Sequence, residues 1–445
     1  MMHSTHIKSL LRTIVATAVL GGISLPGQEA SSNLPLLTLS QAIQIAVENN
    51  RPVKIAQLNI LESKWVVAQT KTKRFPAITT YLFASGNLTN PEFTFPSDLF
   101  DNKQPVKEKL SNGITGLASV EVAQPLSQLY QIHLAVQEQE LSTDLASEQY
   151  KGQRQSVVAS VKQAYYSVLQ TESSLEAQEA MVKQYEETLR VATDYLSQRS
   201  VLKSDSLEAK AQLAQSRYQM IQLQDTLATQ KEQLNELLAR DVDVPFRTEP
   251  VPPITAQEMD LKTARQNALT QRPEVREAEI NTHRADYDRR LSKAKYIPDV
   301  GAAVHYLSPI NTQFLPQNIA SAGLEMKWDP FDWGGRRDEV KQKEVSLEQS
   351  QLQLKETRAQ VTLDVDNTFR KLAETRTMLE VAQAGQEAAD EKLREVNDQF
   401  KHSAVLMRDL LQQEAAVANA NHNYEQSLLA FWNAKAAFEK ALGEE

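Results

Sequence analysis

The chain has 445 residues and a formal net charge of −9, so it lacks the excess of basic side chains that nucleic-acid binding requires. It contains no cysteine, which excludes disulfide bonds, thiolate metal sites and lipid attachment at an N-terminal cysteine. After the first thirty residues, no apolar run is long enough to cross a bilayer as a helix, so any membrane-spanning part would have to be built from strands.

Residues 1–30 are predicted to be a secretory signal peptide. Lys8 and Arg12 precede an apolar run from Thr13 to Leu25, which is too short for a transmembrane helix. Ala30 is a suitable small residue for a cleavage site, whereas Gln28 two positions earlier is not. An uncleaved N-terminal anchor is the alternative interpretation.

The rest of the chain consists of two similar halves, predicted over 31–244 and 256–445, which a Pro-rich linker at 245–255 joins. Each half is expected to contain a leading helix (256–271 in the second half), two strands and a long helical hairpin. The repeat indicates two similar units that build one quasi-symmetric object. The residues of the repeated opening motif are Leu39, Ala42, Ala46, Arg51 and Pro52 in the first half, and Leu261, Ala264, Ala268, Arg272 and Pro273 in the second.

Two strands are predicted in each half. The segments Ala118–Val122 and Leu324–Asp329 alternate apolar residues with polar or charged ones, which is the period of a strand. Their partner strands are expected within 75–89 and 297–307, where the alternation is weak. Polar, Pro-containing loops are expected to connect the paired strands, over roughly 90–112 and 308–318.

The alternation in Leu324–Asp329 fits a sheet with lipid on one face and water on the other. We therefore expect Leu324, Met326 and Trp328 to face lipid. Four strands cannot close a membrane barrel, whose minimum is about eight, so several chains would have to contribute to one barrel. A soluble β-hairpin packed on the helices is the alternative interpretation.

Two stretches, 126–244 and 331–445, contain no proline and are rich in Ala, Gln, Glu, Leu and Lys, which predicts long helices. A break near 198–203 and another near 401–406 divide each stretch into a helical hairpin. After the first break, Ser204 or Asp205 is the expected N-cap of the second helix.

A seven-residue period in the last helix predicts coiled-coil packing. Its residues are Leu410, Val417, Tyr424, Phe431 and Phe438. A second series is less regular, because Glu414, Asn421 and Lys435 interrupt its apolar residues Met407, Leu428 and Leu442. An isolated antiparallel hairpin with both faces in water is the alternative.

The segment Asp329–Arg337 resembles the strand-to-helix corner of TolC-like outer membrane efflux proteins, in which a Pro, an aromatic or apolar pair and two glycines precede an Arg. Here the Pro, the glycines and the Arg are Pro330, Gly334, Gly335 and Arg336. The corner of the first half keeps Pro125 but lacks both glycines. The segments Asn50–Pro52 and Phe400–Leu411 also resemble family motifs, so the resemblance covers residues 35–445.

The resemblance implies a mainly helical fold with a small β part. Three chains would contribute four strands each to a twelve-stranded barrel in the outer membrane, and the helices would form a periplasmic tunnel. It implies an exit channel of a tripartite efflux or type I secretion system, for small toxic compounds or polypeptides. The implied partners are a periplasmic adaptor protein and an inner-membrane pump. A periplasmic coiled-coil adaptor or scaffold without membrane strands is the alternative.

By position, the resemblance places Asp409 at the first carboxylate of a constriction ring near the periplasmic end, and Gln412 where relatives carry a second acid. Asp205 and Glu208 are the equivalents in the first half. An Asp at a helix start is also an ordinary cap, so both interpretations remain open. The expected turn residues at the two hairpin tips are Arg199, Ser200, Lys401, His402 and Ser403, of which Arg199 and Ser403 stand where the family commonly has Gly.

No catalytic constellation is present, so we do not expect an enzyme. The seven histidines are scattered along the sequence, and no zinc-protease, nucleophile-elbow or phosphate-loop motif occurs. No metal site or cofactor is therefore expected. His402 fits either a pH-sensing role or a solvated loop position. Trp328, Phe331 and Trp333 fit either an interfacial aromatic girdle or packing at the corner.

Overall fold

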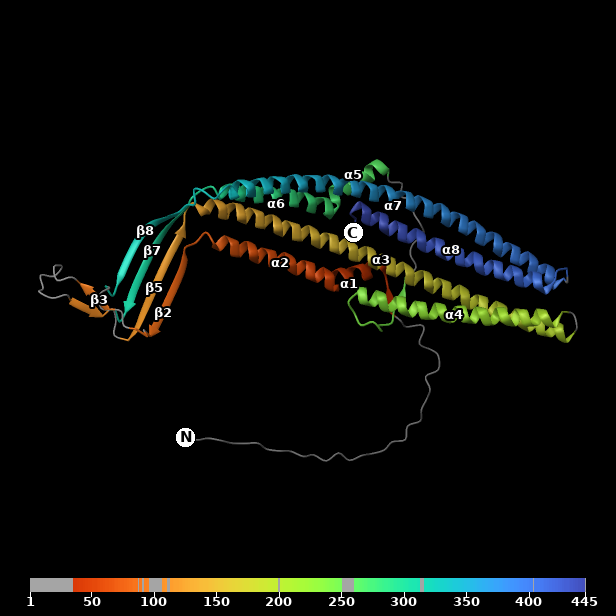
Figure 1. The fold of residues 1–445 in the computed structure, drawn as a ribbon. Helices are drawn as coiled ribbons and strands as arrows, with labels where there is room; N and C mark the ends of the chain where they lie inside the picture. The colour runs from red at the N-terminus through yellow and green to blue at the C-terminus, as the bar shows by residue number, and fades with distance from the viewer. Residues whose placement is uncertain are drawn as a thin grey trace, which may run out of the picture.

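The computed structural model describes residues 35–86, 88–89, 92–95, 106–109, 113–198, 201–249, 260–312, 316–402 and 404–444. The predicted signal peptide lies outside the described residues. The molecule is elongated, with a small sheet at one end and long helices that run away from it (Figure 1). This mainly helical architecture with a small β part confirms the predicted fold class.

The helices occur as two matched sets, which confirms the internal repeat. Corresponding helices have nearly equal lengths, with 11 and 11, 22 and 22, 70 and 67, and 35 and 36 residues. The pairs are α1 Leu39–Asn49 with α5 Leu261–Gln271, α2 Arg51–Thr72 with α6 Pro273–Ala294, α3 Gln128–Ser197 with α7 Gly335–Lys401, and α4 Lys203–Leu237 with α8 Met407–Leu442.

The first helix of each half is followed directly by a second helix that the sequence did not distinguish from it. Helix α1 starts at a capping box, in which Thr38 Oγ1 accepts from the Gln41 amide and Gln41 Oε1 accepts from the Thr38 amide, both at 3.1 Å. Pro52 and Pro273 occupy the first turns of α2 and α6. An amide has no intrahelical partner at these positions, so a proline is tolerated and the chain redirects there.

Four antiparallel strands form the sheet, in the order β2-β5-β7-β8. They are β2 Ala77–Gly86, β5 Ile114–Pro125, β7 Asp299–Ile310 and β8 Ile319–Lys327. The two halves meet where β5 of the first pairs with β7 of the second. All four strands overlap their predicted positions. Strand β8 ends at Lys327, however, so Trp328 and Asp329 follow the strand instead of belonging to it.

Two small sheets were not predicted. Strands β3 Glu92–Phe95 and β4 Val106–Lys109 pair in a segment that we expected to be loop, of which part lies outside the described residues. Strands β1 Leu36–Leu37 and β6 Arg247–Thr248 form a short parallel pair that anchors the start of the linker. The hydroxyl of Tyr165 on α3 donates to Leu37 O at 2.8 Å and accepts from the Glu249 amide at 2.8 Å, which attaches this pair to the helices.

Helix α3 lies at the centre of the bundle and packs against α2, α4, α6 and α8. The largest apolar cluster surrounds Tyr165 and includes Leu234, Phe246, Phe431 and Trp432. None of the described helices combines the length with the hydrophobicity of a membrane-spanning helix.

The predicted seven-residue series of α8 is packed as expected. Leu410, Val417, Phe431 and Phe438 are buried, and Tyr424 is partly buried. Helix α8 packs against α3 as well as against its hairpin partner α7, so the hairpin is not isolated and the coiled-coil interpretation is supported.

Candidate functional site

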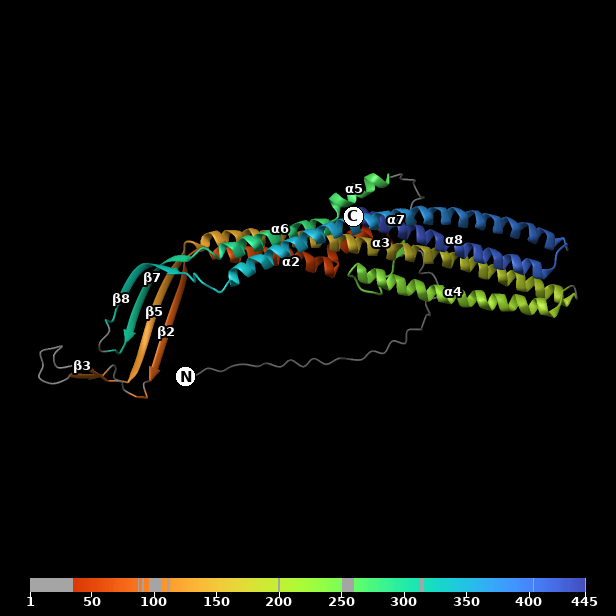
Figure 2. The ribbon, with the colours of Figure 1, turned by 45° about the horizontal axis from the view of Figure 1, so that its top comes forward.

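The tips of the two long hairpins lie side by side at the end of the molecule farthest from the sheet (Figures 1 and 2). The rings of Tyr195 on α3 and Phe400 on α7 are 6.0 Å apart between centroids. Buried Met407, Leu410 and Leu411 belong to the same apolar cluster. The two tips therefore form one packed end.

Asp205 and Asp409 have the same local role at the two tips. The carboxylate of Asp205 accepts a hydrogen bond from the Leu202 amide at 3.2 Å, and that of Asp409 accepts one from the Leu406 amide at 3.1 Å. Each aspartate thus satisfies an amide at the start of its helix from the third helical position. The sequence prediction of Ser204 or Asp205 as N-cap is wrong, because Leu202 is the N-cap residue.

The remaining predicted tip residues are exposed where they are described. Glu208 and Gln412 face solvent, and Arg408 Nε lies 3.7 Å from Asp409 Oδ1. Lys401 pairs with Asp398 at 3.5 Å, and Nδ1 of His402 lies 2.7 Å from Asp398 O. In the described part of the chain, no hydrogen bond or ion pair joins Asp205 or Glu208 to Asp409 or Gln412. Arg199, Ser200 and Ser403 lie outside the described residues.

Two buried glutamates on α8 were not selected from the sequence as site residues. Glu414 is fully buried and accepts from Gln184 Nε2 at 2.9 Å and Thr188 Oγ1 at 2.8 Å, both on α3. Its second oxygen has no hydrogen-bond partner among the described residues. Burial raises the pKa of Glu414 above its ordinary value. The sequence does contain a signal for Glu414, because it occupies a position of the second seven-residue series of α8 at which an apolar residue was expected.

Glu425 repeats this arrangement eleven residues further along α8. Its carboxylate accepts from Ser173 Oγ at 3.0 Å, and burial raises its pKa. Its other oxygen also has no hydrogen-bond partner among the described residues. The α3–α8 interface therefore contains two carboxylates that are only partly satisfied, which stabilises their protonated forms.

The corner between β8 and α7 is organised by Asp332, a residue that the sequence analysis did not single out. Its carboxylate accepts from the amides of Gly334 at 3.1 Å and Arg336 at 2.7 Å. These bonds lower the pKa of Asp332. Gly334 has a φ of 91°, a conformation that favours glycine, which explains the first glycine of the motif. The guanidinium of Arg336 donates to Asp329 O at 2.8 Å and closes the turn.

The corner between β5 and α3 also redirects the chain from a strand into a helix, but it contains no glycine. Strand β5 ends at Pro125 and α3 starts at Gln128. The hydroxyl of Ser127 accepts from the Val300 amide at 2.7 Å, which attaches the helix start to the neighbouring strand β7. No left-handed residue is needed in this shorter turn, so the absence of both glycines has a structural reason.

The register of the sheet separates its apolar and polar faces. One row across all four strands is Ile78, Val122, Val304 and Ala322. The next row is Thr79, Glu121, His305 and Ser321. Neighbouring rows face opposite sides of a sheet, so at these two rows one face is apolar and the other polar. The next row on the polar face also contains Tyr81, Leu307 and Ile319.

Leu324 and Met326 share the apolar face with Ala322 and are 75% and 67% exposed in the single chain. Beyond the strand, Phe331 and Trp333 are also exposed, and their rings are in edge-to-face contact at 4.9 Å. This end of the molecule therefore presents an apolar surface that a single chain in water would not stabilise.

The sequence profile of the family described as "Outer membrane efflux protein" matches residues 42–240 and 264–444. The two matches correspond to the two halves of the chain. A comparison with curated proteins finds no match.

Several solved structures share the fold over more than nine-tenths of this chain. The CmeC outer membrane channel of Campylobacter jejuni is 13% identical, with a TM-score of 0.76 over 94% of this chain and 90% of that one. The outer membrane protein VceC of Vibrio cholerae is 14% identical, with a TM-score of 0.75 over 91% and 96%. The open-state MtrE outer membrane channel of Neisseria gonorrhoeae is 15% identical, with a TM-score of 0.72 over 91% and 89%.

Proposed function

The chain belongs to the outer membrane efflux protein family, and from this premise we propose that three copies close one barrel that serves as the exit duct of a tripartite export system. The observation that carries the proposal is the amphipathic four-stranded sheet at one end of the chain. Its apolar face fits lipid, and its polar face fits a water-filled lumen.

The edges of this sheet require further strands. Within the described residues, β2 pairs with β5 and β8 pairs with β7, so each of the two outer strands has one edge without a partner. Long unpaired edges are not stable in lipid, where backbone groups need partners within the protein. Three chains with four strands each would satisfy both edges and give twelve strands, above the minimum of about eight for a membrane barrel.

The long helices also leave apolar side chains for neighbouring copies. Helix α2 exposes Ile55, Leu58 and Trp65, and α7 exposes Val345 and Leu352. In the proposed trimer these faces pack between subunits and complete a tunnel that continues from the barrel. The packed tips would form its periplasmic end, to which an adaptor protein and an inner-membrane pump dock.

At this end, Asp409 and Asp205 are the proposed constriction residues, with Gln412 and Glu208 one turn further along. Copies of one carboxylate around an axis repel each other and attract cations, so such a ring would favour a gate that responds to charge. The bond that each aspartate accepts at its helix start is compatible with this role, because only one oxygen of each carboxylate takes part in that bond. Small toxic compounds or polypeptides are the proposed cargo.

Disulfide trapping between chains would test the shared barrel, since the natural chain contains no cysteine. Strands β5 and β7 separate β2 from β8, so the edges of one chain are about 14 Å apart, too far for a disulfide. Four double variants would each combine Thr80→Cys on β2 with one cysteine on the same face of β8. The second position would be Ala320, Ala322, Leu324 or Met326.

We expect at least one of these pairs to link two and three chains in oxidised outer membranes, and light scattering to give the mass of three chains. Thr80→Cys alone is the control and should give no linked trimer. A mass of one or two chains, without linkage in any pair, would overturn the proposal and favour a periplasmic scaffold.

A further inference from the structure

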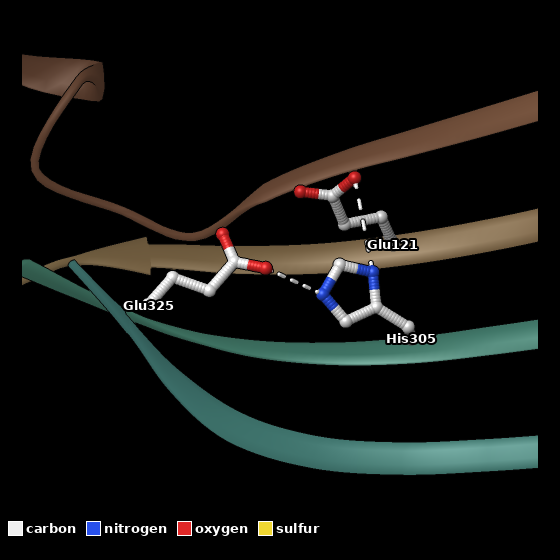
Figure 3. A group of neighbouring side chains, drawn as sticks. All are labelled: Glu121, His305 and Glu325. Carbon is white, nitrogen blue, oxygen red and sulfur yellow. Dashed lines mark hydrogen bonds and ion pairs between the residues drawn. The ribbon is translucent and has the colours of Figure 1, made fainter. Parts of the chain in front are cut away.

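Three side chains from three neighbouring strands meet on the polar face of the sheet (Figure 3). They are Glu121 on β5, His305 on β7 and Glu325 on β8. His305 Nε2 lies 2.9 Å from Glu325 Oε1, and His305 Nδ1 lies 3.9 Å from Glu121 Oε2. One ligand atom from each residue can be chosen so that all three lie within 4.8 Å of one another.

The strand register explains why these residues meet. Glu121 is directly opposite His305, whereas Glu325 is opposite Gly301, which lies four residues before His305 on β7. The row between them on this face contains small residues, because Ala303 is opposite Gly323. Ala303 is only 3% exposed. The small residues leave space above the sheet in which the imidazole and the Glu325 carboxylate extend towards each other.

The charges of the cluster are unbalanced. The ion pairs recorded for Glu121 and Glu325 among the described residues are both with His305. A neutral imidazole would leave two carboxylates without a cation, and a protonated one would still leave a net charge of −1. A bound cation would balance this charge.

We propose that Glu121, His305 and Glu325 bind one divalent transition-metal cation of the Zn²⁺ type. One imidazole nitrogen and two carboxylate oxygens are donors that Zn²⁺ accepts, whereas Mg²⁺ and Ca²⁺ prefer sites made of oxygen alone. Donors around tetrahedral Zn²⁺ are about 3.3 Å apart, given bonds of about 2.0 Å. The two carboxylates face different nitrogens of the imidazole, so Glu121 would have to rotate towards Nε2, beside Glu325, to share one ion with it.

The proposed site is open to solvent. The side chains of His305, Glu121 and Glu325 are 40%, 44% and 63% exposed. Three protein ligands on an exposed face leave at least one position for water, unlike the closed four-ligand sites that stabilise folds. The site needs only the sheet of one chain, so it does not depend on the proposed barrel or on export.

Calorimetric titration of the purified, metal-free full chain in detergent with Zn²⁺ tests the proposal. We expect one Zn²⁺ per chain at this site, and excess Mg²⁺ should not displace it. His305→Ala should weaken this binding by about tenfold or more. His283→Ala removes an exposed histidine of α6 and is the matched control, which should bind as the natural chain does.

Glu325→Gln provides a second variant with a nearly unchanged shape, in case the alanine variant fails to fold. It should also weaken Zn²⁺ binding, while circular dichroism and native mass stay unchanged. Absence of Zn²⁺ binding to the natural chain would overturn the proposal. So would equal binding by the natural chain and both site variants.

Discussion

Helices α3 and α7 occupy equivalent places in the two halves, yet their surroundings differ greatly. Helix α3 has 70 residues, of which 17 are buried, whereas α7 has 67 residues, of which six are buried. The reason is position, because α3 packs extensively against helices of both halves, while α7 packs mainly against α5, α6 and α8 of its own half. More of α3 is therefore buried within its own chain, whereas α7 has an exposed face that another chain could cover.

The largest expected effect comes from removing the centre of α3. Tyr165→Ala should lower the free energy of unfolding by about 3–5 kcal/mol, because it creates a cavity and removes the bonds to Leu37 and Glu249. Val381→Ala on α7, where the side chain is 68% exposed, should change it by less than about 0.5 kcal/mol. Denaturant unfolding of both variants as dissociated single chains checks this. Similar losses would show that the two helices are not differently buried.

The open face of α7 can be tested through assembly. Val345→Asp combined with Leu352→Asp should place charges in the proposed subunit interface and shift most of the protein from three chains to one. The fold of the single chain should survive, because both side chains are exposed in it. Native light scattering measures the mass, with Val345→Ile and Leu352→Met as the control pair. A charged variant that stays trimeric would contradict the assigned interface.

The α3–α8 contact should depend on pH through Glu414. Its pKa is raised in the folded chain, so the folded state binds more protons than the unfolded state above the ordinary value of 4.5. Stability should therefore fall as pH rises from about 4.5 through the raised pKa. Glu414→Gln keeps an acceptor for Gln184 and Thr188 without the charge.

We expect Glu414→Gln to be more stable than the natural chain by about 1 kcal/mol at pH 8, a difference that disappears towards pH 4.5. Thermal unfolding across this pH range measures it. A constant difference at all pH values would mean that ionisation of Glu414 is not involved.

The smallest effects are expected at the tips, where Asp205 and Asp409 can be compared directly. Both Asp205→Ala and Asp409→Ala should cost about 1 kcal/mol or less, because each removes one bond to a helix-start amide. If the carboxylates also line a constriction, the variants should raise the conductance of the purified channel or weaken its block by cations. Single-channel recording distinguishes a constriction role from a purely structural one. If each aspartate only stabilises the start of its helix, cation block should be unchanged in both variants.

Much of the fold was predictable because it depends on local sequence. The absence of proline over more than a hundred residues, twice, predicts the long helices, and the alternation of Leu324–Lys327 predicts a strand. The series from Leu410 to Phe438 predicts a buried stripe. Side chains seven residues apart on a helix, or two apart on a strand, point the same way wherever the element lies. The repeat then indicated that each element occurs twice.

The contacts between distant segments were decided only by the tertiary structure. Glu121, His305 and Glu325 belong to three strands, and their meeting depends on the pairing of β5 with β7 across the two halves. Asp332 acquires its role from the path of a turn, and Glu414 is buried because α3 passes beside α8. Helices α3 and α7 have similar lengths, and burial separates them because α3 packs against helices of both halves. Local periodicity shows which face of an element is apolar, but what covers that face depends on how the whole chain, and its copies, come together.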